Sequence, residues 1–458
     1  MSKQFRLFIC VLLSGISLHA QNFTIIDSVR AGAYGTAAWG DYDGDGRKDL
    51  AYISQTMNVD SPDMFHIYHN TLSGFELVAT LPMLFGPAVA WADFDNDGKQ
   101  DIVVSGLGSP AGQLLIYRSN GDGSFPLMNG TLEGSSFGAI DAVDFDNDGL
   151  IDFAATGIPN SGEEKTIVFK NQGNFQFVDI GAELKGMNMG EMKWCDYDND
   201  GKPDLALSGR TTLSTNAYLY HNEGNDSFSL GTAYMKGASG TLDWFDYNGD
   251  GKMDLLLAGM DSTSVFNFLE LHRNNGDGTF TKQANNIPVF GEPVATDIAD
   301  FNGDGKPDIC FMGGTDAFPI ENSALCIGNN STNFVSNSFF KADITNVMIA
   351  AADIDNDGDQ DMIFSNYILR NDATPTNIKD LTEEDIQVYP NPAEDYMVID
   401  ATYNKMELVI TDILGRRMLS KTLMIGRNNL DVSKIAKGNY ILQVIHGDRS
   451  FAKTISIK

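Results

Sequence analysis

The chain is poor in basic residues and in histidine. Its 458 residues include 31 lysines and arginines against 62 aspartates and glutamates, for a formal net charge of −31, and six histidines. No basic stripe follows the sequence, which argues against nucleic-acid binding. Neither a nucleophile motif nor a zinc triad stands out, whereas acid–base catalysis needs a cluster of titratable groups at one site. We therefore expect a binding or structural protein, not an enzyme.

Cysteine is rarer still. Of four cysteines, Cys10 lies near the N-terminus, and Cys195, Cys310 and Cys326 remain for the folded protein. This odd number argues against a disulfide framework. Cys310 and Cys326 fall in neighbouring predicted strands of one repeat, where two interpretations stay open: a disulfide, or two buried free thiols.

Long apolar runs are lacking except at the N-terminus. Lys3 and Arg6 precede an apolar stretch at residues 7–17, and cleavage after Ala20 is plausible, so residues 1–20 are predicted to be a secretory signal peptide. The stretch is too short for a membrane-spanning helix, and no later segment is apolar enough to be one. Cys10 has no good lipobox before it, which leaves lipid anchoring as a minor alternative.

The chain does contain one acidic motif in seven copies. The pattern is D-x-[DN]-x-D-G-x-x-D followed by Leu, Ile, Phe or Met, with copies spaced 50 to 54 residues apart. They begin at Asp41, Asp93, Asp144, Asp196, Asp246, Asp300 and Asp353. Five copies hold four aspartates each and two hold three, so the motif accounts for most of the net charge. A repeat of this period predicts an array of equal structural units.

Each copy has the donors of a calcium loop. In the first, Asp41, Asp43, Asp45 and Asp49 supply carboxylates, and the backbone carbonyl of Arg47 would add an oxygen. Glycine at position 6 allows the tight curl that this convergence needs. Several oxygen ligands suit calcium better than magnesium or zinc. An EF-hand would need a glutamate at position 12 and flanking helices, whereas a strand-like apolar run follows each copy.

We therefore predict up to seven Ca²⁺ ions; the alternative is a set of polar turns without metal. The predicted ligands are Asp41, Asp43, Asp45, Arg47, Asp49; Asp93, Asp95, Asp97, Lys99, Asp101; Asp144, Asp146, Asp148, Leu150, Asp152; Asp196, Asp198, Asp200, Lys202, Asp204; Asp246, Asn248, Asp250, Lys252, Asp254; Asp300, Asn302, Asp304, Lys306, Asp308; and Asp353, Asp355, Asp357, Asp359, Asp361.

Around each loop the sequence predicts four strands, the size of one propeller blade, and seven blades close readily into a ring. The third strand ends in an Asn followed by a Phe, in the pairs Asn70/Phe75, Asn120/Phe125, Asn171/Phe175, Asn222/Phe228, Asn275/Phe280 and Asn329/Phe334. Asn371 has no such Phe, but Phe23 begins a strand ahead of the first loop. We predict an all-β fold with a seven-bladed β-propeller over residues 21–371, closed by the N-terminal strand.

Two positions in the first strand of each repeat carry informative side chains. All four tryptophans lie two residues before a loop, where packing between blades is favoured over sugar stacking. One residue earlier, Asp141, Lys193, Asp243 and Asp297 place charge in an otherwise apolar strand. Because charge is expensive between sheets, these four are predicted to face the central channel, either as a solvated lining or as a ligand site.

The loops, together with Phe85-Gly86, Phe137-Gly138 and Phe290-Gly291 ahead of three of them, resemble the FG-GAP/VCBS repeat family, which includes the integrin-α-like seven-bladed propellers. The resemblance covers about residues 22–372. It implies calcium hairpins on one face and ligand binding on the other, through loops between blades and between second and third strands.

The C-terminal part of the chain differs from the repeats. Residues 372–384 are predicted to be a linker, and residues 385–458 a small β-sandwich (Ig-like) domain. VYPNP (388–392), TDILGR (411–416) and GNYIL (438–442) resemble the type A sorting domain of the type IX secretion system of Bacteroidetes. That resemblance implies export by the type IX machinery, removal of the domain, and release outside the cell or attachment to the outer-membrane surface.

These features predict a secreted or cell-surface calcium-binding propeller that binds a glycan or protein partner, as an adhesin or lectin does. This step rests on architecture, which is a weak guide to function. Two alternatives stay open: a carbohydrate-active enzyme such as a polysaccharide lyase on the same propeller, and a purely structural surface protein.

Overall fold

The computed structural model describes residues 23–29, 34–55, 64–71, 73–108, 112–128, 132–212, 214–231, 235–237, 239–260, 267–287, 294–315, 318–338, 348–372, 386–402, 406–411, 417–446 and 449–458. The predicted signal peptide and nearly all of the predicted linker lie outside these residues. Within them every regular element is a strand, which confirms the all-β prediction. No helix of the described residues has the length and apolarity to cross a membrane.

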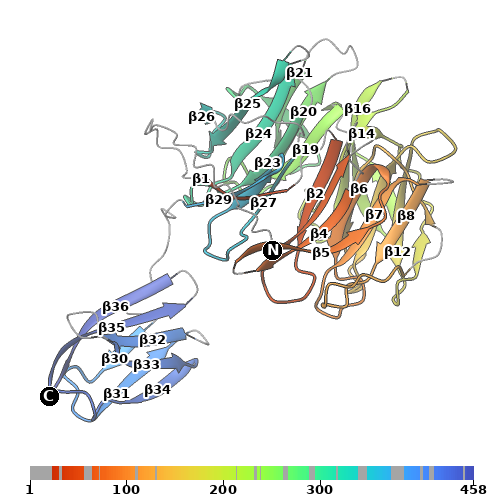
Figure 1. Cartoon of the computed structure of the whole chain (residues 1–458). Helices are drawn as coiled ribbons and strands as arrows, with labels where there is room; N and C mark the ends of the chain where they lie inside the picture. The colour runs from red at the N-terminus through yellow and green to blue at the C-terminus, as the bar shows by residue number, and fades with distance from the viewer. Residues whose placement is uncertain are drawn as a thin grey trace.

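Most of the described strands belong to a propeller (Figure 1). They form seven sheets, called blades 1 to 7 here, each in the strand order given. The blades are β2 (Tyr34–Gly40), β3 (Asp49–Gln55), β4 (Met64–Thr71), β5 (Gly74–Leu81); β6 (Phe85–Ala92), β7 (Asp101–Leu107), β8 (Gly112–Tyr117), β9 (Leu132–Glu133); β10 (Ile140–Val143), β11 (Asp152–Gly157), β12 (Lys165–Asn171), β13 (Phe177–Asp179); β14 (Asn188–Cys195), β15 (Asp204–Arg210), β16 (Thr215–Gly224), β17 (Ser227–Leu230), with β18 (Met235–Lys236) also on β16; β19 (Ser239–Phe245), β20 (Asp254–Met260), β21 (Asn267–Asn274), β22 (Phe280–Gln283); β23 (Val294–Ala299), β24 (Asp308–Thr315), β25 (Phe318–Ile327), β26 (Val335–Ser338); and β27 (Ile349–Ala352), β28 (Asp361–Phe364), β29 (Tyr367–Asn371), β1 (Phe23–Ser28).

The blades form a closed ring. Their first strands touch in the cyclic order β2, β6, β10, β14, β19, β23, β27 and back to β2. β1 pairs antiparallel with β29, with Phe23 opposite Asn371, so the N-terminal strand is the outer strand of the last blade. The first and last strands of the propeller therefore pair in one sheet, and the last blade has its full set of four strands.

Second strands such as β7 and β20 are buried almost along their whole length, because each is covered on both faces by neighbouring blades. The tryptophans fill the wedge between first strands. Trp194 stacks on Phe145 with ring centroids 6.1 Å apart. Three indole N–H groups donate to carbonyls of the preceding blade, in the pairs Trp39–Ala350 (2.8 Å), Trp91–Ala38 (3.0 Å) and Trp194–Asp141 (3.2 Å). This geometry agrees with packing between blades, the interpretation favoured from the sequence.

Two of the three remaining cysteines, Cys310 and Cys326, are buried in blade 6, and both are in the thiol form. They lie on the adjacent strands β24 and β25 and do not form a disulfide. Of the two interpretations left open by the sequence, the structure therefore shows buried thiols.

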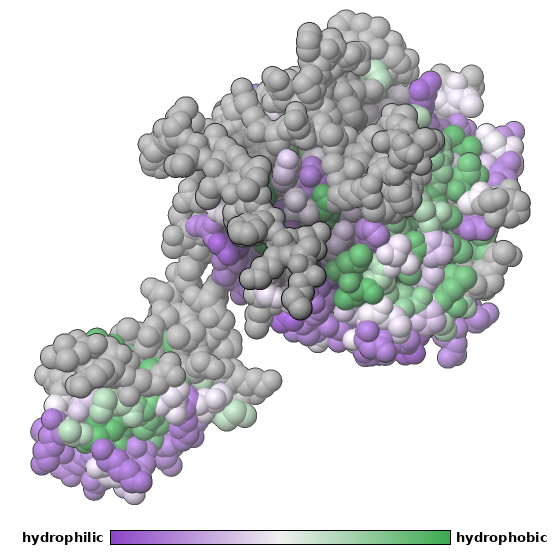
Figure 2. All heavy atoms as spheres, viewed as in Figure 1, coloured by the Kyte–Doolittle hydropathy of each residue, from purple (hydrophilic) through white to green (hydrophobic). Residues whose placement is uncertain are grey.

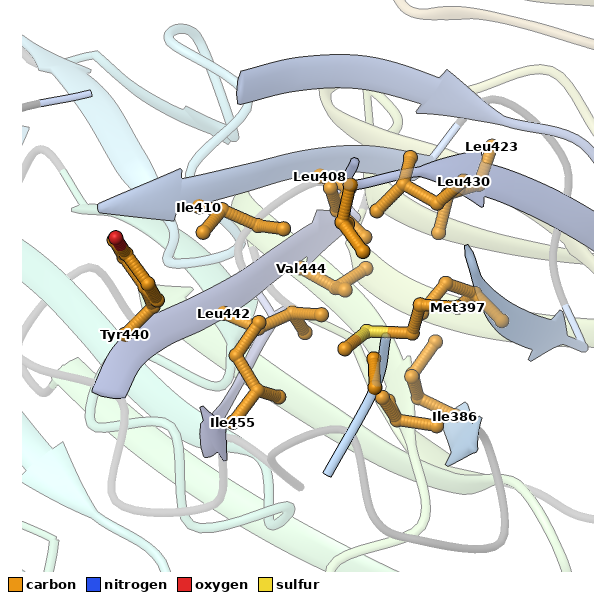
Figure 3. Close-up of a cluster of buried hydrophobic side chains, with 14 of the residues drawn as sticks. Ile386, Met397, Leu408, Ile410, Leu423, Leu430, Tyr440, Leu442, Val444 and Ile455 are labelled. Carbon is orange, nitrogen blue, oxygen red and sulfur yellow. The ribbon is translucent and has the colours of Figure 1, made fainter. Parts of the chain in front are cut away.

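The C-terminal module has its own core. One sheet contains β30 (Ile386–Tyr389), β31 (Tyr396–Ala401) and β34 (Gly426–Asp431). The other contains β33 (Arg417–Leu423), β32 (Met406–Thr411), β35 (Gly438–His446) and β36 (Arg449–Ile457). Side chains of both sheets, among them Met397 and Leu442, meet between them (Figure 3). Two sheets enclosing one apolar layer make a β-sandwich.

Candidate metal centres

The seven acidic loops share one internal hydrogen-bond pattern. In each loop the position-1 aspartate accepts the backbone N–H of position 5 through one carboxylate oxygen and that of the position-6 glycine through the other. The glycine bonds measure 2.9, 2.8, 2.8, 2.9, 2.7, 2.6 and 3.2 Å in loops 1 to 7. The position-6 glycines have φ between +80° and +95°, a region that L side chains rarely adopt. The curl of the chain therefore follows from the sequence pattern.

The curl gathers the carboxylates predicted to bind metal. Ligand oxygens lie within 4.8 Å of one another in the groups Asp41/Asp43/Asp45, Asp93/Asp95/Asp101 and Asp144/Asp146/Asp152, among others. One oxygen of Asp95 is buried and meets no hydrogen-bond donor among the described residues. A set of converging carboxylates with an orphaned oxygen is chemically suited to a hard cation such as calcium. The role of the position-7 backbone carbonyl as the fifth ligand of each loop stays a prediction.

The position-9 aspartates are the most enclosed of these groups. Asp101 is fully buried, and its carboxylate accepts the N–H of Phe94 (3.0 Å) and of Ser119 (2.8 Å). Burial is the main cause that raises the pKa of Asp101 to about 7, and the neighbouring Asp95 and Asp97 raise it further. The equivalent aspartates of the other six loops have a pKa of about 6 or 7 for the same first reason. Without a cation, this crowding of carboxylates is unfavourable.

Basic side chains relieve part of that crowding. At position 7, Lys99 lies 3.1 Å from Asp97, and Lys306 lies 3.1 Å from Asp304. A residue near the end of the third strand adds a second cation in some blades, as where Arg118, directly after β8, bonds Asp95 at 2.7 Å. The loops therefore differ in how many positive charges surround the same donor set.

In five of the seven blades, an asparagine at the end of the third strand joins the loop of its own blade to the loop of the preceding blade. In blade 4 the backbone N–H of Asn222 donates to Asp204 (2.8 Å), and its side-chain amide donates to the carbonyl of Phe145 in the loop of blade 3 (2.8 Å). The same pair of bonds is made by Asn70, Asn171, Asn274 and Asn371.

Three of the predicted asparagines are out of register. Ser119, Asn274 and Gly328 occupy the position that the sequence pattern assigned to Asn120, Asn275 and Asn329. Ser119 keeps the link to the neighbouring loop through its hydroxyl. The sequence placed these asparagines one residue too late, because a polar turn directly follows the third strand. Only the hydrogen bond to the position-9 aspartate identifies the residue that joins the loop.

Comparison with known families agrees with this geometry. The model of the FG-GAP-like repeat matches residues 41–104, 93–155, 144–207, 196–257 and 246–311, which together span more than half of the chain. The chain belongs to the FG-GAP-like repeat family. A second model, the secretion system C-terminal sorting domain, matches residues 387–458.

No curated protein matches the chain. Among solved structures, a lectin from Agrocybe aegerita described as recognising non-reducing terminal N-acetylglucosamine is 17% identical, over 67% of this chain and 80% of that one, with a TM-score of 0.43. PorZ, a surface component of the type IX secretion system of Porphyromonas gingivalis, is 14% identical over 90% of this chain and 58% of that one, with a TM-score of 0.43. AofleA from Arthrobotrys oligospora is 11% identical over 73% and 94%, with a TM-score of 0.39.

The sorting domain has direct consequences for this FG-GAP protein. A type IX C-terminal sorting domain implies interaction with the type IX secretion machinery and secretion to the cell surface or the extracellular space. These statements apply to the whole chain, because the sorting domain is its C-terminal module.

The family's FG element lies at the end of the first strand opposite the metal loops. Met189 donates its N–H to Phe137 (2.7 Å), and Phe137 donates its own to Gly86 (2.8 Å). Gly86, Phe137 and Met189 are therefore equivalent, and the Phe85-Gly86 and Phe137-Gly138 pairs lie one residue out of register. Phe290-Gly291 lies outside the described residues.

Large apolar side chains are exposed along this row. Phe85 (49% exposed), Leu107 (43%), Phe137 (37%) and Met189 (48%) form what we call the apolar ridge, across blades 2 to 4. The rings of Phe85 and Phe137 meet edge to face at 5.3 Å. Figure 2 shows apolar side chains exposed on the part of the propeller where Figure 1 labels β6, β7 and β8. Phe137 and Met189 have φ of +56° and +50°, a conformation that is costly for bulky residues.

The four charged first-strand residues lie near one another, around Lys193. Its amine lies 3.3 Å from Glu191 and 4.0 Å from Asp243, and its side chain is 40% exposed. The charges of Glu191 first, then of Asp243, Asp141 and Asp297, hold the pKa of Lys193 well above its ordinary value. Burial raises the pKa of the three aspartates.

The sequence did not indicate a role for Glu191, and it did not indicate that these carboxylates hydrogen-bond the neighbouring blade. They accept backbone N–H groups of the next blade's first strand, in the pairs Asp141–Trp194 (2.8 Å), Glu191–Leu242 (3.0 Å) and Asp297–Ala351 (2.6 Å). First strands have no ladder partner on the channel side, so these carboxylates satisfy donors that would otherwise be unpaired. The cluster therefore joins neighbouring blades, and its role as a channel lining stays a prediction.

Two histidines also depart from expectation. His69 Nδ1 lies 3.0 Å from Asp49, and His221 Nδ1 lies 3.1 Å from Asp204 and 3.2 Å from Asp198. The sequence pattern did not single out either histidine. Each immediately precedes the third-strand asparagine and therefore runs beside its own loop. The resulting Asp/Asp/His groups combine nitrogen and oxygen donors.

Proposed function

We propose that this protein is a secreted propeller that uses a ring of calcium ions for rigidity and binds a glycan or protein partner on the opposite face, as an adhesin or lectin does. The apolar ridge is the observation that carries the binding role. It lies where first strands begin and the second strand β7 ends, away from the metal loops, and exposes four large apolar side chains in three neighbouring blades. Contiguous exposed apolar groups on a soluble surface are typical of binding sites.

The conformation of the ridge supports the same proposal. Phe137 and Met189 keep a left-handed backbone although glycine would adopt it without strain. Strain of this kind concentrates at functional sites, where the surrounding structure maintains it. Aromatic residues and methionine are also enriched in the cores of protein interfaces.

Calcium is proposed as the resident cation because the donors fit it. Each loop offers at least three side-chain carboxylates in a preformed curl, and the orphaned oxygen of Asp95 lies within such a set. Bound calcium would neutralise crowded carboxylates and fix the loops that are hydrogen-bonded from blade to blade. The ions would thereby hold the ridge-bearing strands in one arrangement.

A polysaccharide lyase is the weaker proposal. A lyase would need a neutral amine or another base to remove a proton from a sugar carbon. Lys193 is the amine in the channel, and four carboxylates hold its pKa high, which keeps it protonated and unsuited to act as a base. The chemistry of this cluster therefore favours the structural role described above.

The test is a glycan-array screen of the full chain in calcium and in EDTA, with a ridge variant and a matched control. Phe85→Gln combined with Met189→Gln removes two exposed ridge side chains, whereas Leu230→Gln removes an equally exposed one (55%) on the outer strand of blade 4. Loss of anchoring residues should weaken binding by about tenfold or more. We expect calcium-dependent binding that the ridge variant loses and the control keeps.

Glycan binding that survives the ridge substitutions would move the site elsewhere on the propeller. If no glycan binds to the folded protein, the same variants are assayed against purified cell-surface proteins. Failure of both screens would leave the purely structural role.

A further inference from the structure

The seventh loop differs from the other six at position 7. Five loops have Lys or Arg there and one has Leu150, whereas the seventh has Asp359. The basic residues at this position lie against the position-5 carboxylate, as Lys99 does against Asp97. In the seventh loop a carboxylate takes the place of that cation beside Asp357.

Asp359 is enclosed and lacks a donor. It is 1% exposed, and among the described residues neither of its carboxylate oxygens meets a hydrogen-bond donor. Leaving an ionised carboxylate buried and unpaired costs several kcal/mol or more. Two neighbouring carboxylates also accept only, so Asp357 and Asp359 do not satisfy each other unless a proton or a cation lies between them.

Nearby positive charge does not compensate. The third-strand cation of this blade, Arg370, lies 4.0 Å from Asp355 but bonds Asp372 at 2.7 Å, which holds its guanidinium away from the loop. The seventh loop thus has five carboxylates and one distant cation, the largest excess of negative charge among the seven loops.

We propose that the seventh loop is the tightest calcium site of the ring, with the Asp359 side chain supplying a fifth carboxylate, and that its ion fastens the last blade to the first. The number of charged ligands is a main determinant of calcium affinity. This proposal rests on the calcium proposal above and adds which loop fills first and what that ion holds.

The position of the loop supports the second half of the proposal. Asn356, inside the seventh loop, donates to the carbonyl of Gly46 in the first loop (3.0 Å), and Asn70 of blade 1 donates to Ile354 of the seventh loop. An ion that orders this loop therefore orders both bonds across the seam where the two ends of the ring meet.

The experiment is equilibrium dialysis of the full chain over a series of buffered free-calcium concentrations, with bound metal counted. We expect one ion to bind at a free calcium concentration about tenfold or more below the rest. Asp359→Lys, which installs the residue of loops 2, 4, 5 and 6, should abolish that first step. Leu150→Lys, which installs the same residue at position 7 of loop 3, should leave it intact.

Lys202→Asp tests the idea by gain of affinity, because it gives loop 4 five aspartates as in loop 7, and it should create a second tight ion there even if the loss variant fails to fold. A first step unchanged in Asp359→Lys, or no second tight ion in Lys202→Asp, would overturn the proposal. If the wild-type chain binds no calcium at any concentration, the calcium proposal itself fails, which is a distinguishable result. Hydrogen exchange of β1 should slow as the first ion binds, and slowing only at later steps would overturn the seam role.

Discussion

Removal of calcium should destabilise this propeller far more than the loss of any one site. Each loop places buried or half-buried carboxylates within a few ångströms of one another. Chelation exposes that repulsion in all loops at once, whereas Asp144→Asn weakens one loop and keeps an oxygen that accepts the Asp148 N–H. Because neighbouring loops are hydrogen-bonded, as Asn147 is to Gly201 at 3.0 Å, loss at one site should be partly shared with the next.

The size of the effect follows from mass action. A site that binds only the folded chain adds about 2.7 kcal/mol when free calcium is about 100 times its Kd. For a domain of this length, 1 kcal/mol shifts the Tm by about 1–2 °C. We therefore expect Asp144→Asn to lower the Tm by about 3–6 °C, and EDTA to remove an amount comparable to the whole net stability of about 5–15 kcal/mol.

The assay is calorimetric melting of the full chain in excess calcium, in excess EDTA, and in EDTA followed by added calcium. Magnesium alone serves as the control, since the loops are expected to prefer calcium. A Tm that is equal with and without EDTA would refute the metal assignment. A drop for Asp144→Asn as large as the drop in EDTA would refute the additive picture and indicate that one site controls the ring.

Two further predictions concern protons and the link between loops. In EDTA the stability should fall between about pH 4 and pH 7. Burial raises the pKa of position-9 aspartates such as Asp101 from 3.8 to about 7, so the stability that their protonated form contributes is fully present below about pH 4 and is lost as the pH rises through about 7. In calcium the trend should reverse, because the ion binds deprotonated carboxylates, and melting curves across this range in each buffer check both signs. Asn222→Ala should cost about 1–3 kcal/mol in calcium, because it leaves the buried carbonyls of Phe145 and Pro203 without their shared amide donor. Asn120→Ala, at the exposed turn position mistaken for this role, should cost less than about 0.5 kcal/mol in the same denaturation assay.

The repeat and the metal loops could be predicted because their chemistry is local. A curl that brings positions 1, 3, 5 and 9 together needs glycine at position 6, and all seven position-6 glycines have the left-handed φ that this requirement implies. The apolar run after each loop predicts a buried second strand, as β7 shows. These features depend on residues within one short segment, so the sequence alone is sufficient evidence for them.

Features that depend on the neighbouring blade were harder to predict. Glu191 carries no repeat signal, and its role becomes visible only where its carboxylate meets the Leu242 N–H of blade 5. His69 and His221 gave no sequence signal of these contacts, because the loop aspartate that each one meets is distant in sequence and near in space. From the sequence, Asp359 was predicted to bind the ion only through its backbone carbonyl. A role for its side chain is indicated only by the burial of that side chain in the folded protein.

The joint that closes the ring, between blades 7 and 1, is built like the joints between consecutive blades. At an internal joint, between blades 3 and 4, three side chains bond the backbone of the neighbouring blade, in the pairs Trp194–Asp141, Asn222–Phe145 and Asn147–Gly201. At the seam between blades 7 and 1, the corresponding pairs are Trp39–Ala350, Asn70–Ile354 and Asn356–Gly46. Residues about 300 positions apart thus make the bonds that adjacent repeats make elsewhere. The bonds that close the ring are therefore encoded in every repeat. The seventh loop differs only by its extra carboxylate, Asp359, which would help to hold its ion.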